Sequence, residues 1–307
     1  MKVLITGSNG FVGGYLRREL EAHGYCVTGM DLQAGDSVVP ADLLNADAVA
    51  KVIRDVAPDV VFHLAGQTSV SSSWKMPQRT MEVNINGALN LMDAVRAFNP
   101  AVRVVMIGSS DQYGKTNTRE QMVSETMPLH PQTPYAVSKR AQEEITQIYI
   151  QAYGMNICMT RSFNHGGAGQ QEGFMIPDFA AGIVRVERGE ATQLRVGNLT
   201  ACRDFTHVKD VVRAYRLIAE YGTAGEIYNV GSGRSYSARD ILDRLCSMAK
   251  CPIPVYEDPG KMRPNDNSTI RCNYEKLTHD TGWKPVYTID DILWDTLEFF
   301  RNKQQST

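Results

Sequence analysis

Long hydrophobic runs, clustered cysteines and an excess of charge are all missing from this sequence of 307 residues. No apolar stretch approaches the roughly 18 residues that a membrane-spanning helix requires, so we expect no membrane partner. The formal net charge is −2 and 21% of the residues are charged. Because there is no basic excess, we expect neither nucleic acid nor an anionic lipid surface as a partner.

The six cysteines are scattered and form no CxxC pair. They predict neither a metal site nor a disulfide framework, and reduced thiols are typical of a cytoplasmic protein. The first residues, MKVLITGSNGFVGG, contain a short apolar run that breaks into a glycine-rich loop. We therefore expect a first β-strand there and not a signal peptide, which also favours a cytoplasmic protein.

Short apolar runs alternate with amphipathic segments through the first half of the chain. Runs such as VLI, VVF and VVMI suit strands that are buried on both faces, and helices between successive strands imply a parallel sheet. The expected strands are 2–6, 25–30, 60–64, 102–107 and 157–160, and the expected helices are 13–23, 46–56, 77–98 and 134–153. The fold class predicted is α/β, a Rossmann-like doubly wound parallel sheet with a smaller C-terminal substrate-binding region.

The alternation loosens after Arg161, but no internal repeat or low-complexity linker appears. We therefore expect the C-terminal part to lean on the first half and not to hang from a tether. Further strands are expected near 193–196, 203–208 and 227–230, and further helices near 176–188, 238–249 and 290–301.

A glycine-rich loop, GSNGFVG, follows the first expected strand and opens the first expected helix. Glycines permit the tight turn and let backbone N–H groups approach a pyrophosphate, which then lies at the positive end of the helix. The strand–loop–helix context is the one that a dinucleotide site requires. The residues expected to contact the dinucleotide here are Gly7, Asn9, Gly10, Phe11, Val12 and Gly13.

Asp31 ends the second expected strand, about 20 residues after the glycine loop, where a carboxylate accepts hydrogen bonds from the adenosine ribose. A carboxylate repels a 2′-phosphate, and residues 32–39 contain no Arg or Lys, so the sequence favours NAD over NADP. An exposed Asp at a strand end is the alternative. Asp42, followed by Leu43, could reach the adenine, although a turn-capping role fits Asp42 equally well.

The run HLAG ends the third expected strand and supplies a loop of small residues next to the cofactor. We expect Leu64, Ala65 and Gly66 to contact the cofactor. His63 is assigned to strand packing.

The fourth expected strand leads into GSSDQYG at the carboxyl edge of the sheet, where α/β proteins bind ligands. Tyr135 and Lys139 in YAVSK are four residues apart and share one helix face. Redox chemistry on an alcohol needs a group that exchanges the hydroxyl proton, and a Tyr with a pKa near 10 is a poor base. An ammonium about 4 Å away supplies about 4 kcal/mol, so we expect Lys139 to lower the pKa of Tyr135 by about three units. Ser109 would hold the substrate oxygen.

Taken together, TGSNGFVG, HLAG, NING, GSSDQYG and YAVSK resemble the extended short-chain dehydrogenase/reductase family of sugar-nucleotide epimerases, dehydratases and reductases. The resemblance covers nearly the whole chain. It implies a catalytic trio of Ser109, Tyr135 and Lys139, with Lys139 also holding the nicotinamide ribose and Asn84 supporting it. It also implies a homodimer through the helices expected at 77–98 and 134–153.

The resemblance further implies that Ser110, Asn164, Arg203 and Arg263 contact the substrate. Such an Asn lies near the substrate phosphates in the family, and the two Arg match positions that clamp a nucleotide diphosphate, for which guanidinium forks are suited. Within the family, three sets of motifs look most like those of GDP-4-keto-6-deoxymannose reductases. They are FNH before a glycine-rich loop, VGN with RDF, and MRP. GDP-mannose 4,6-dehydratases are close relatives.

Two features keep other reactions open. Asp111 lies where dehydratases of this type place the group that removes the C5 proton, although Asp is shorter than their usual Glu and related reductases also carry an acid. Asp31 favours NAD, and NAD that is held tightly and is reduced and reoxidised within each turnover would suit a dehydratase or a 4-epimerase. The expected reaction is reduction of the C4 ketone of a GDP-4-keto-6-deoxyhexose to a GDP-rhamnose-type product. A non-catalytic nucleotide-binding regulator is a third possibility, but it would not need the catalytic trio.

These expectations divide the chain into two regions. Residues 1–164, with 204–230 returning to them, are expected to form the NAD(P)-binding domain. Residues 165–203 and 231–307 are expected to bind the nucleotide sugar.

Overall fold

The central sheet begins with β1 (Lys2–Thr6), whose side chains are buried on both faces. In the computed structural model, which describes residues 1–114, 122–261 and 270–303, Val3 and Ile5 pack against one layer of helices and Leu4 against the other. Seven strands pair in parallel. In spatial order they are β11 (Ile227–Val230), β7 (Ile157–Ser162), β5 (Arg103–Ser109), β4 (Val60–His63), β1, β2 (Cys26–Asp31) and β3 (Val38–Pro40).

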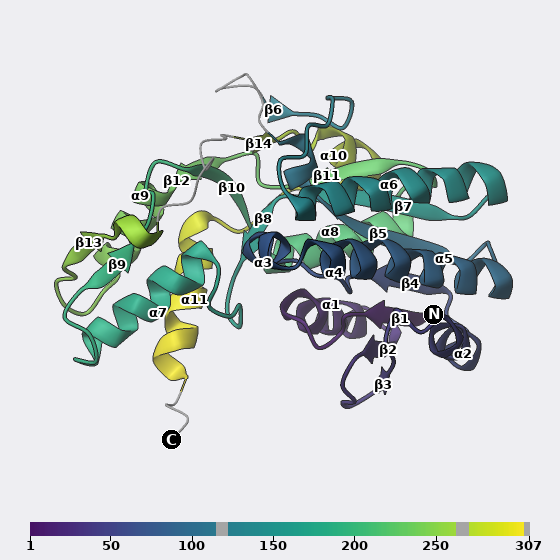
Figure 1. Cartoon of the computed structure of the whole chain (residues 1–307), viewed down its shortest axis with the longest axis horizontal. Coiled ribbons are helices and arrows are strands. Elements are labelled where there is room, and N and C mark those ends of the chain that lie inside the picture. Colours follow the sequence, from purple (N-terminus) through teal and green to yellow (C-terminus); the bar gives the residue numbers. More distant parts are fainter. Residues whose placement is uncertain (115–121, 262–269, 304–307) are drawn as a thin grey trace.

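Helices cover both faces of this sheet (Figure 1). One layer contains α1 (Phe11–Ala22), α8 (Val208–Tyr221) and α10 (Glu275–Thr281), and the other contains α2 (Ala46–Val56), α5 (Gly87–Phe98) and α6 (Pro134–Tyr153). The predicted α/β class, a doubly wound Rossmann-like sheet, is therefore confirmed. No helix in the described ranges is long and apolar enough to cross a membrane.

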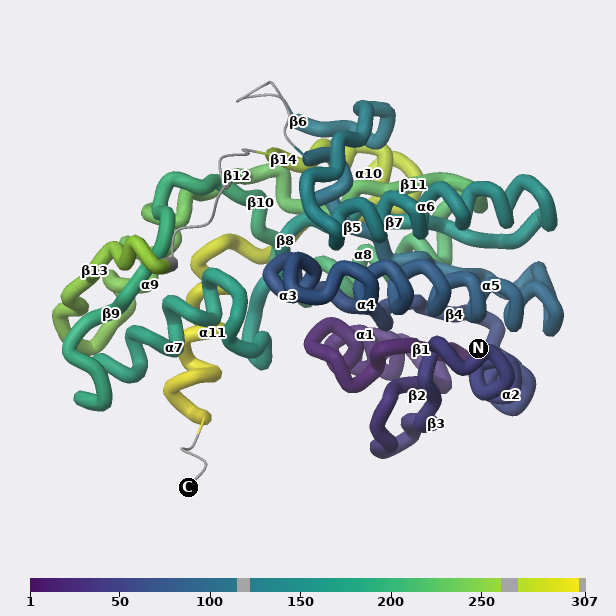
Figure 2. The backbone as a smooth tube through the Cα atoms, viewed as in Figure 1, coloured from purple at the N-terminus to yellow at the C-terminus, as the bar shows by residue number. Residues whose placement is uncertain are grey.

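The C-terminal region has its own apolar cluster and lies to one side of the central sheet, as the path of the tube in Figure 2 shows. Its helices are α7 (Met175–Glu187), α9 (Ala238–Ser247) and α11 (Ile289–Asn302). Its strands form small sheets. They are β8 (Asn164–Gly166), β9 (Leu194–Val196), β10 (Cys202–His207), β12 (Ser235–Ser237) and β13 (Val255–Glu257). The 3₁₀ turn Pro259–Lys261 follows β13.

Several short elements were not predicted, because two to seven residues carry no readable period. They include β3, β6 (Met122–Val123), β8, β12, β13, β14 (Arg271–Cys272), α3 (Val70–Lys75) and α10. The helix predicted over 77–98 is in fact α4 (Pro77–Met81), a π-helical turn η1 (Glu82–Asn86) and α5. Such turns are frequent at functional sites, and this one contains the buried Asn84.

Candidate active site

The loop between β1 and α1 is built so that only glycine fits at two of its positions. Gly7 has a φ of 72°, and a Cβ there would come within 2.8 Å of the Ala65 amide nitrogen. A Cβ on Gly13 would lie 2.5 Å from the Gly7 carbonyl oxygen. Gly10 caps α1 in an extended conformation without a side-chain acceptor. The free amides at the start of α1 therefore suit a pyrophosphate, which is the fit that a dinucleotide cofactor requires.

Replacing Gly13 with Ala is expected to weaken cofactor binding at least about tenfold, because the loop must shift to relieve the contact with Gly7. Gly24→Ala is the matched control for introducing a methyl group, since no atom lies within 4 Å of its Cβ position, although its φ of 79° brings some strain. Titration of both variants with NADH, followed by fluorescence, measures the effect. Equal affinities would contradict the assignment of this loop.

Asp31 is tied to the glycine loop by its carboxylate, which accepts hydrogen bonds from the Asn9 amide at 3.0 Å and from the Leu32 amide at 2.8 Å. Asp42 accepts from the Leu44 amide at 2.9 Å, so the turn-capping role is the one seen here. The Leu43 side chain is 7% exposed and packs in the core, which leaves its backbone as the part that could meet a ligand. Phe11 and Val12 pack against the apolar layer beneath α1.

The loop after β4 lies between the end of β1 and helix α6. The Ala65 amide donates to Thr6 Oγ1 at 3.2 Å, and Leu64 follows β4 directly. A Cβ on Gly66 would lie 2.9 Å from Asn84 Oδ1 and 3.9 Å from Lys139 Nζ. The fold thus brings Gly66, in the loop after β4, next to Lys139 of α6, although the two residues are distant in the sequence.

Asn84 holds these parts together from the π-helical turn. Its Nδ2 donates to Ser138 Oγ at 2.9 Å and to the Gln67 carbonyl at 3.1 Å, and its Oδ1 accepts from the Gln67 amide at 2.8 Å. His63 is 1% exposed, its Nδ1 pairs with Thr6 Oγ1 at 2.8 Å, and burial with the nearby Lys139 charge lowers its pKa to about 3. A neutral, packed His63 agrees with its predicted role.

Ser109, Asp111, Tyr135 and Arg203 meet at the carboxyl end of β5. The Ser109 hydroxyl caps the 3₁₀ turn η2 (Ser110–Tyr113) by accepting from the Asp111 amide at 3.2 Å, and the Ser109 side chain also acts to lower the pKa of Tyr135. The charge of Asp111 acts to raise the pKa of Tyr135, and the charge of Arg203 acts to lower the pKa of Asp111. Burial raises the pKa of Asp111, which makes it a candidate proton carrier.

The predicted lowering of the Tyr135 pKa by about three units is wrong for this structure, and the charge of Lys139 is not among the causes of the shift. The pKa of Tyr135 is raised well above 10, because burial disfavours the phenolate and the Asp111 charge adds to that, while the Ser109 hydrogen bond opposes both. Lys139 Nζ instead donates to the Ile107 carbonyl at 2.9 Å and to Gln142 Oε1 at 2.8 Å. Tyr135 is therefore a neutral phenol in this structure.

The remaining predicted substrate residues lie around the same edge. Ser110 is 5% exposed in η2, and Asn164 begins β8, where it pairs with Phe205 of β10. Arg203 lies in β10, next to the buried Asp204, and donates to the Cys202 carbonyl at 2.8 Å. Arg263 lies outside the described residues. No group of three potential ligands that could hold a metal occurs in the ranges described.

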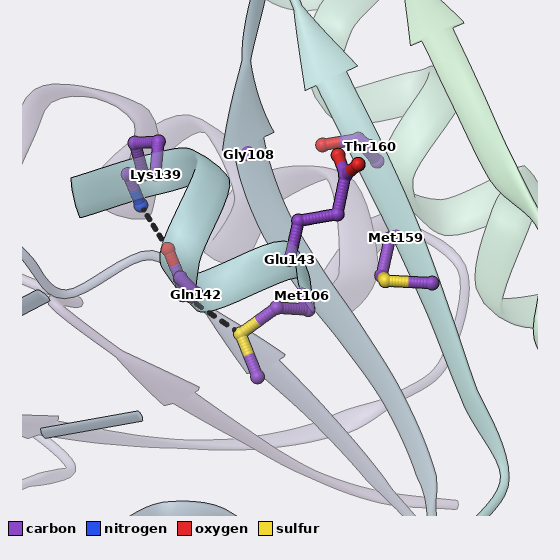
Figure 3. Close-up of a pocket in the computed structure, with 7 residues that line it drawn as sticks. All are labelled: Met106, Gly108, Lys139, Gln142, Glu143, Met159 and Thr160. Carbon is purple, nitrogen blue, oxygen red and sulfur yellow. Dashed lines mark hydrogen bonds between the residues drawn. The ribbon is translucent and has the colours of Figure 1, made fainter. Parts of the chain in front are cut away.

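Functional contacts that sequence analysis missed lie in the α6 helix and beside α1. The Tyr15 hydroxyl donates to the Ala168 carbonyl at 2.8 Å, and the rings of Phe11 and His165 are parallel with centroids 6.4 Å apart. These contacts join α1 to β8 and to the glycine-rich loop that follows it. Gln142 faces Lys139 in the narrow gap between α6, β5 and β7 (Figure 3). The i, i+3 spacing from Lys139 was the available signal.

Comparisons with known proteins agree with this geometry. The family model for GDP-mannose 4,6 dehydratase matches residues 4–296. The chain is 34% identical to the GDP-6-deoxy-D-mannose reductase of Pseudomonas aeruginosa, covering 95% of this chain and 94% of that one. It is 30% identical to GDP-mannose 4,6 dehydratase 1 of Arabidopsis thaliana, covering 94% and 87%.

Solved structures lead to the same family. RMD from Pseudomonas aeruginosa complexed with NADPH has a TM-score of 0.89 at 33% identity, covering 98% of both chains. UDP-glucose 4-epimerase from Thermus thermophilus in complex with NAD has a TM-score of 0.88 at 29% identity, covering 98% of this chain and 99% of that one. The chain belongs to the GDP-mannose 4,6 dehydratase family, as an NAD(P)-dependent nucleotide-sugar enzyme of the extended short-chain dehydrogenase/reductase type.

Proposed function

We propose that the protein reduces the C4 ketone of a GDP-4-keto-6-deoxyhexose. The observation that carries the proposal is the neutral, buried Tyr135 phenol, whose pKa responds to the neighbouring Ser109 and Asp111 side chains. Ketone reduction needs a proton donor at the new hydroxyl, whereas oxidation of an alcohol needs a base. The similarity to a reductase over nearly the full length of both chains supports the same direction.

Each residue has a distinct role in this proposal. Tyr135 donates its proton to the substrate oxygen, and Ser109 orients that oxygen. Lys139 holds the nicotinamide ribose, and its ammonium stabilises the phenolate that proton donation leaves behind. Arg203 and Asn164 bind the diphosphate side of the substrate, together with Arg263. The nicotinamide cofactor, when bound, supplies the hydride.

We propose NAD(H) as the preferred cofactor. Asp31 keeps its carboxylate at the end of β2, against the Asn9 amide, where the charge disfavours a 2′-phosphate. RMD from Pseudomonas aeruginosa was solved in complex with NADPH, so NADPH is the cofactor against which this preference has to be tested. Asp31→Asn is therefore the informative variant.

A 4,6-dehydratase acting on GDP-mannose is the second candidate, and the position of Asp111 favours it. Its carboxyl group interacts with both Tyr135 and Arg203, and burial raises its pKa, as a group that moves a carbon-bound proton requires. The matching family model carries the dehydratase description.

One assay separates these reactions. We expect kcat/KM for the reduction of GDP-4-keto-6-deoxymannose to be at least about tenfold higher with NADH than with NADPH. Asp31→Asn should lower this ratio of kcat/KM values, because it removes the charge that disfavours a 2′-phosphate. The measurement is kcat/KM, followed by loss of reduced-nicotinamide absorbance. Turnover of GDP-mannose by purified protein without added cofactor would instead support the dehydratase.

We further propose a homodimer through 77–98 and 134–153, since Phe98, Ile148 and Tyr153 leave apolar side chains exposed on these helices. A cytoplasmic location is proposed because all six cysteines are free thiols. The division into 1–164 with 204–230, and 165–203 with 231–307, also stays a proposal.

A further inference from the structure

The ammonium of Lys139 is held by two acceptors on different elements. The Ile107 carbonyl of β5 accepts at 2.9 Å, and Gln142 Oε1 of α6 accepts at 2.8 Å. A lysine ammonium has three N–H donors, so these contacts engage two of them and leave one for a ligand. Lys139 is 4% exposed, and its Nζ lies next to Gly66 in the loop after β4.

Gln142 is itself fixed in orientation. It is 2% exposed, three residues after Lys139 on the same helix face, and its Nε2 contacts Met106 Sδ at 2.9 Å. Figure 3 shows the Gln142 side chain between Lys139 and Met106. Because sulfur can only accept, the amide N–H end faces Met106 and the carbonyl end faces the ammonium.

We propose that Gln142 is a positioning residue that keeps Lys139 charged and aims its remaining N–H group at the cofactor ribose. The inference rests on the proposed function, in which Lys139 holds that ribose. A neutral amide serves this purpose better than a carboxylate, because it stabilises the ammonium without cancelling the charge that stabilises the Tyr135 phenolate.

Burial lowers the pKa of Lys139 to about 8, so the loss of one acceptor would bring its deprotonation toward neutral pH. The titratable side chains on the elements around it include His63 of β4, Glu82 of η1, Asp111 and Tyr113 of η2, Arg161 of β7, and Tyr135 and Glu143 of α6 itself. The others are Lys75 of α3, Arg79 of α4, Asp93 and Arg96 of α5, Arg103 of β5, Cys158 of β7, and Arg140, Glu144, Tyr149 and Tyr153 of α6. Glu143 is paired with Arg161, and Glu82 forms an exposed pair with Arg79. The pKa of His63 is about 3, and those of Tyr113 and Tyr135 are raised.

The test is the affinity of the protein for NADH between about pH 6 and about pH 10. In the wild type, the dissociation constant should rise about tenfold as Lys139 deprotonates and its charged hydrogen bond weakens. Gln142→Leu should move this transition down by about one pH unit, and Gln142→Glu should move it up by about one. A purely structural role would not shift the transition in opposite directions.

Three controls make the outcome decisive. Gln147→Leu, partly buried on the same helix, should keep the wild-type transition. Lys139→Met should abolish it; if instead this variant keeps both affinity and transition, the proposed role of Lys139 fails. Should Lys139→Met lose the transition while both Gln142 variants keep it at the wild-type pH, only the inference about Gln142 is overturned. If Gln142→Leu does not fold by circular dichroism, Gln142→Glu alone decides.

Discussion

Replacing Tyr135 with Phe is expected to lower kcat about 10³-fold while leaving the affinity for NADH nearly unchanged. The phenol is the proton donor in the proposed reaction, and a positioned general acid contributes about 10²- to 10⁴-fold. The ring itself stays, so the packing of this 8% exposed side chain is kept. Stopped-flow measurement of nicotinamide oxidation, beside a fluorescence titration with NADH, separates chemistry from binding.

Tyr149→Phe is the matched control on the same helix. Its hydroxyl donates to Asp93 at 3.0 Å, so its removal costs about 1 kcal/mol of stability and no turnover. If Tyr135→Phe keeps wild-type kcat, Tyr135 is not the proton donor and the proposed mechanism is wrong. A loss of NADH binding in Tyr135→Phe would instead show that the hydroxyl holds the cofactor.

The sequence was most informative where a short motif lies at a strand end. The glycine loop after β1 and the serines at the end of β5 were placed correctly, because the carboxyl ends of parallel strands share one edge of the sheet. The helix limits 46–56 and 134–153 were also predicted as observed. Asn45 caps the first of these helices, while Thr133 followed by Pro134 starts the second.

The electrostatics of the site could not be read from the same motifs. The spacing of Tyr135 and Lys139 predicted a shared helix face, but it could not show that Lys139 turns to Ile107 and Gln142. Nor could it show how far burial and Asp111 oppose ionisation of the phenol. Desolvation depends on the complete packing around a group, so its size follows from the tertiary structure and not from spacing.

Removing Glu143 is expected to be the most destabilising single change near the site. Its carboxylate receives two hydrogen bonds from Arg161, at 2.9 Å and 2.7 Å, and the two side chains are 6% and 5% exposed. Arg161 also donates to the Tyr113 hydroxyl at 3.0 Å and to the Glu125 carbonyl at 2.9 Å. The pair therefore connects α6 to β7 and to the turn that follows Ser109.

Glu143→Ala would leave the Arg161 guanidinium buried without its counter-charge. The free energy of unfolding should fall by about 3–5 kcal/mol, measured by urea denaturation. Glu144→Ala is the control: its pair with Arg140 spans 2.8 Å, but the side chains are 57% and 41% exposed, so it should change stability by less than about 1 kcal/mol. Equal effects of the two variants would contradict this account. Changing Glu143 and Arg161 together to Leu should recover part of the loss, because the cost lies in the unpaired charge and not in the absence of a salt bridge.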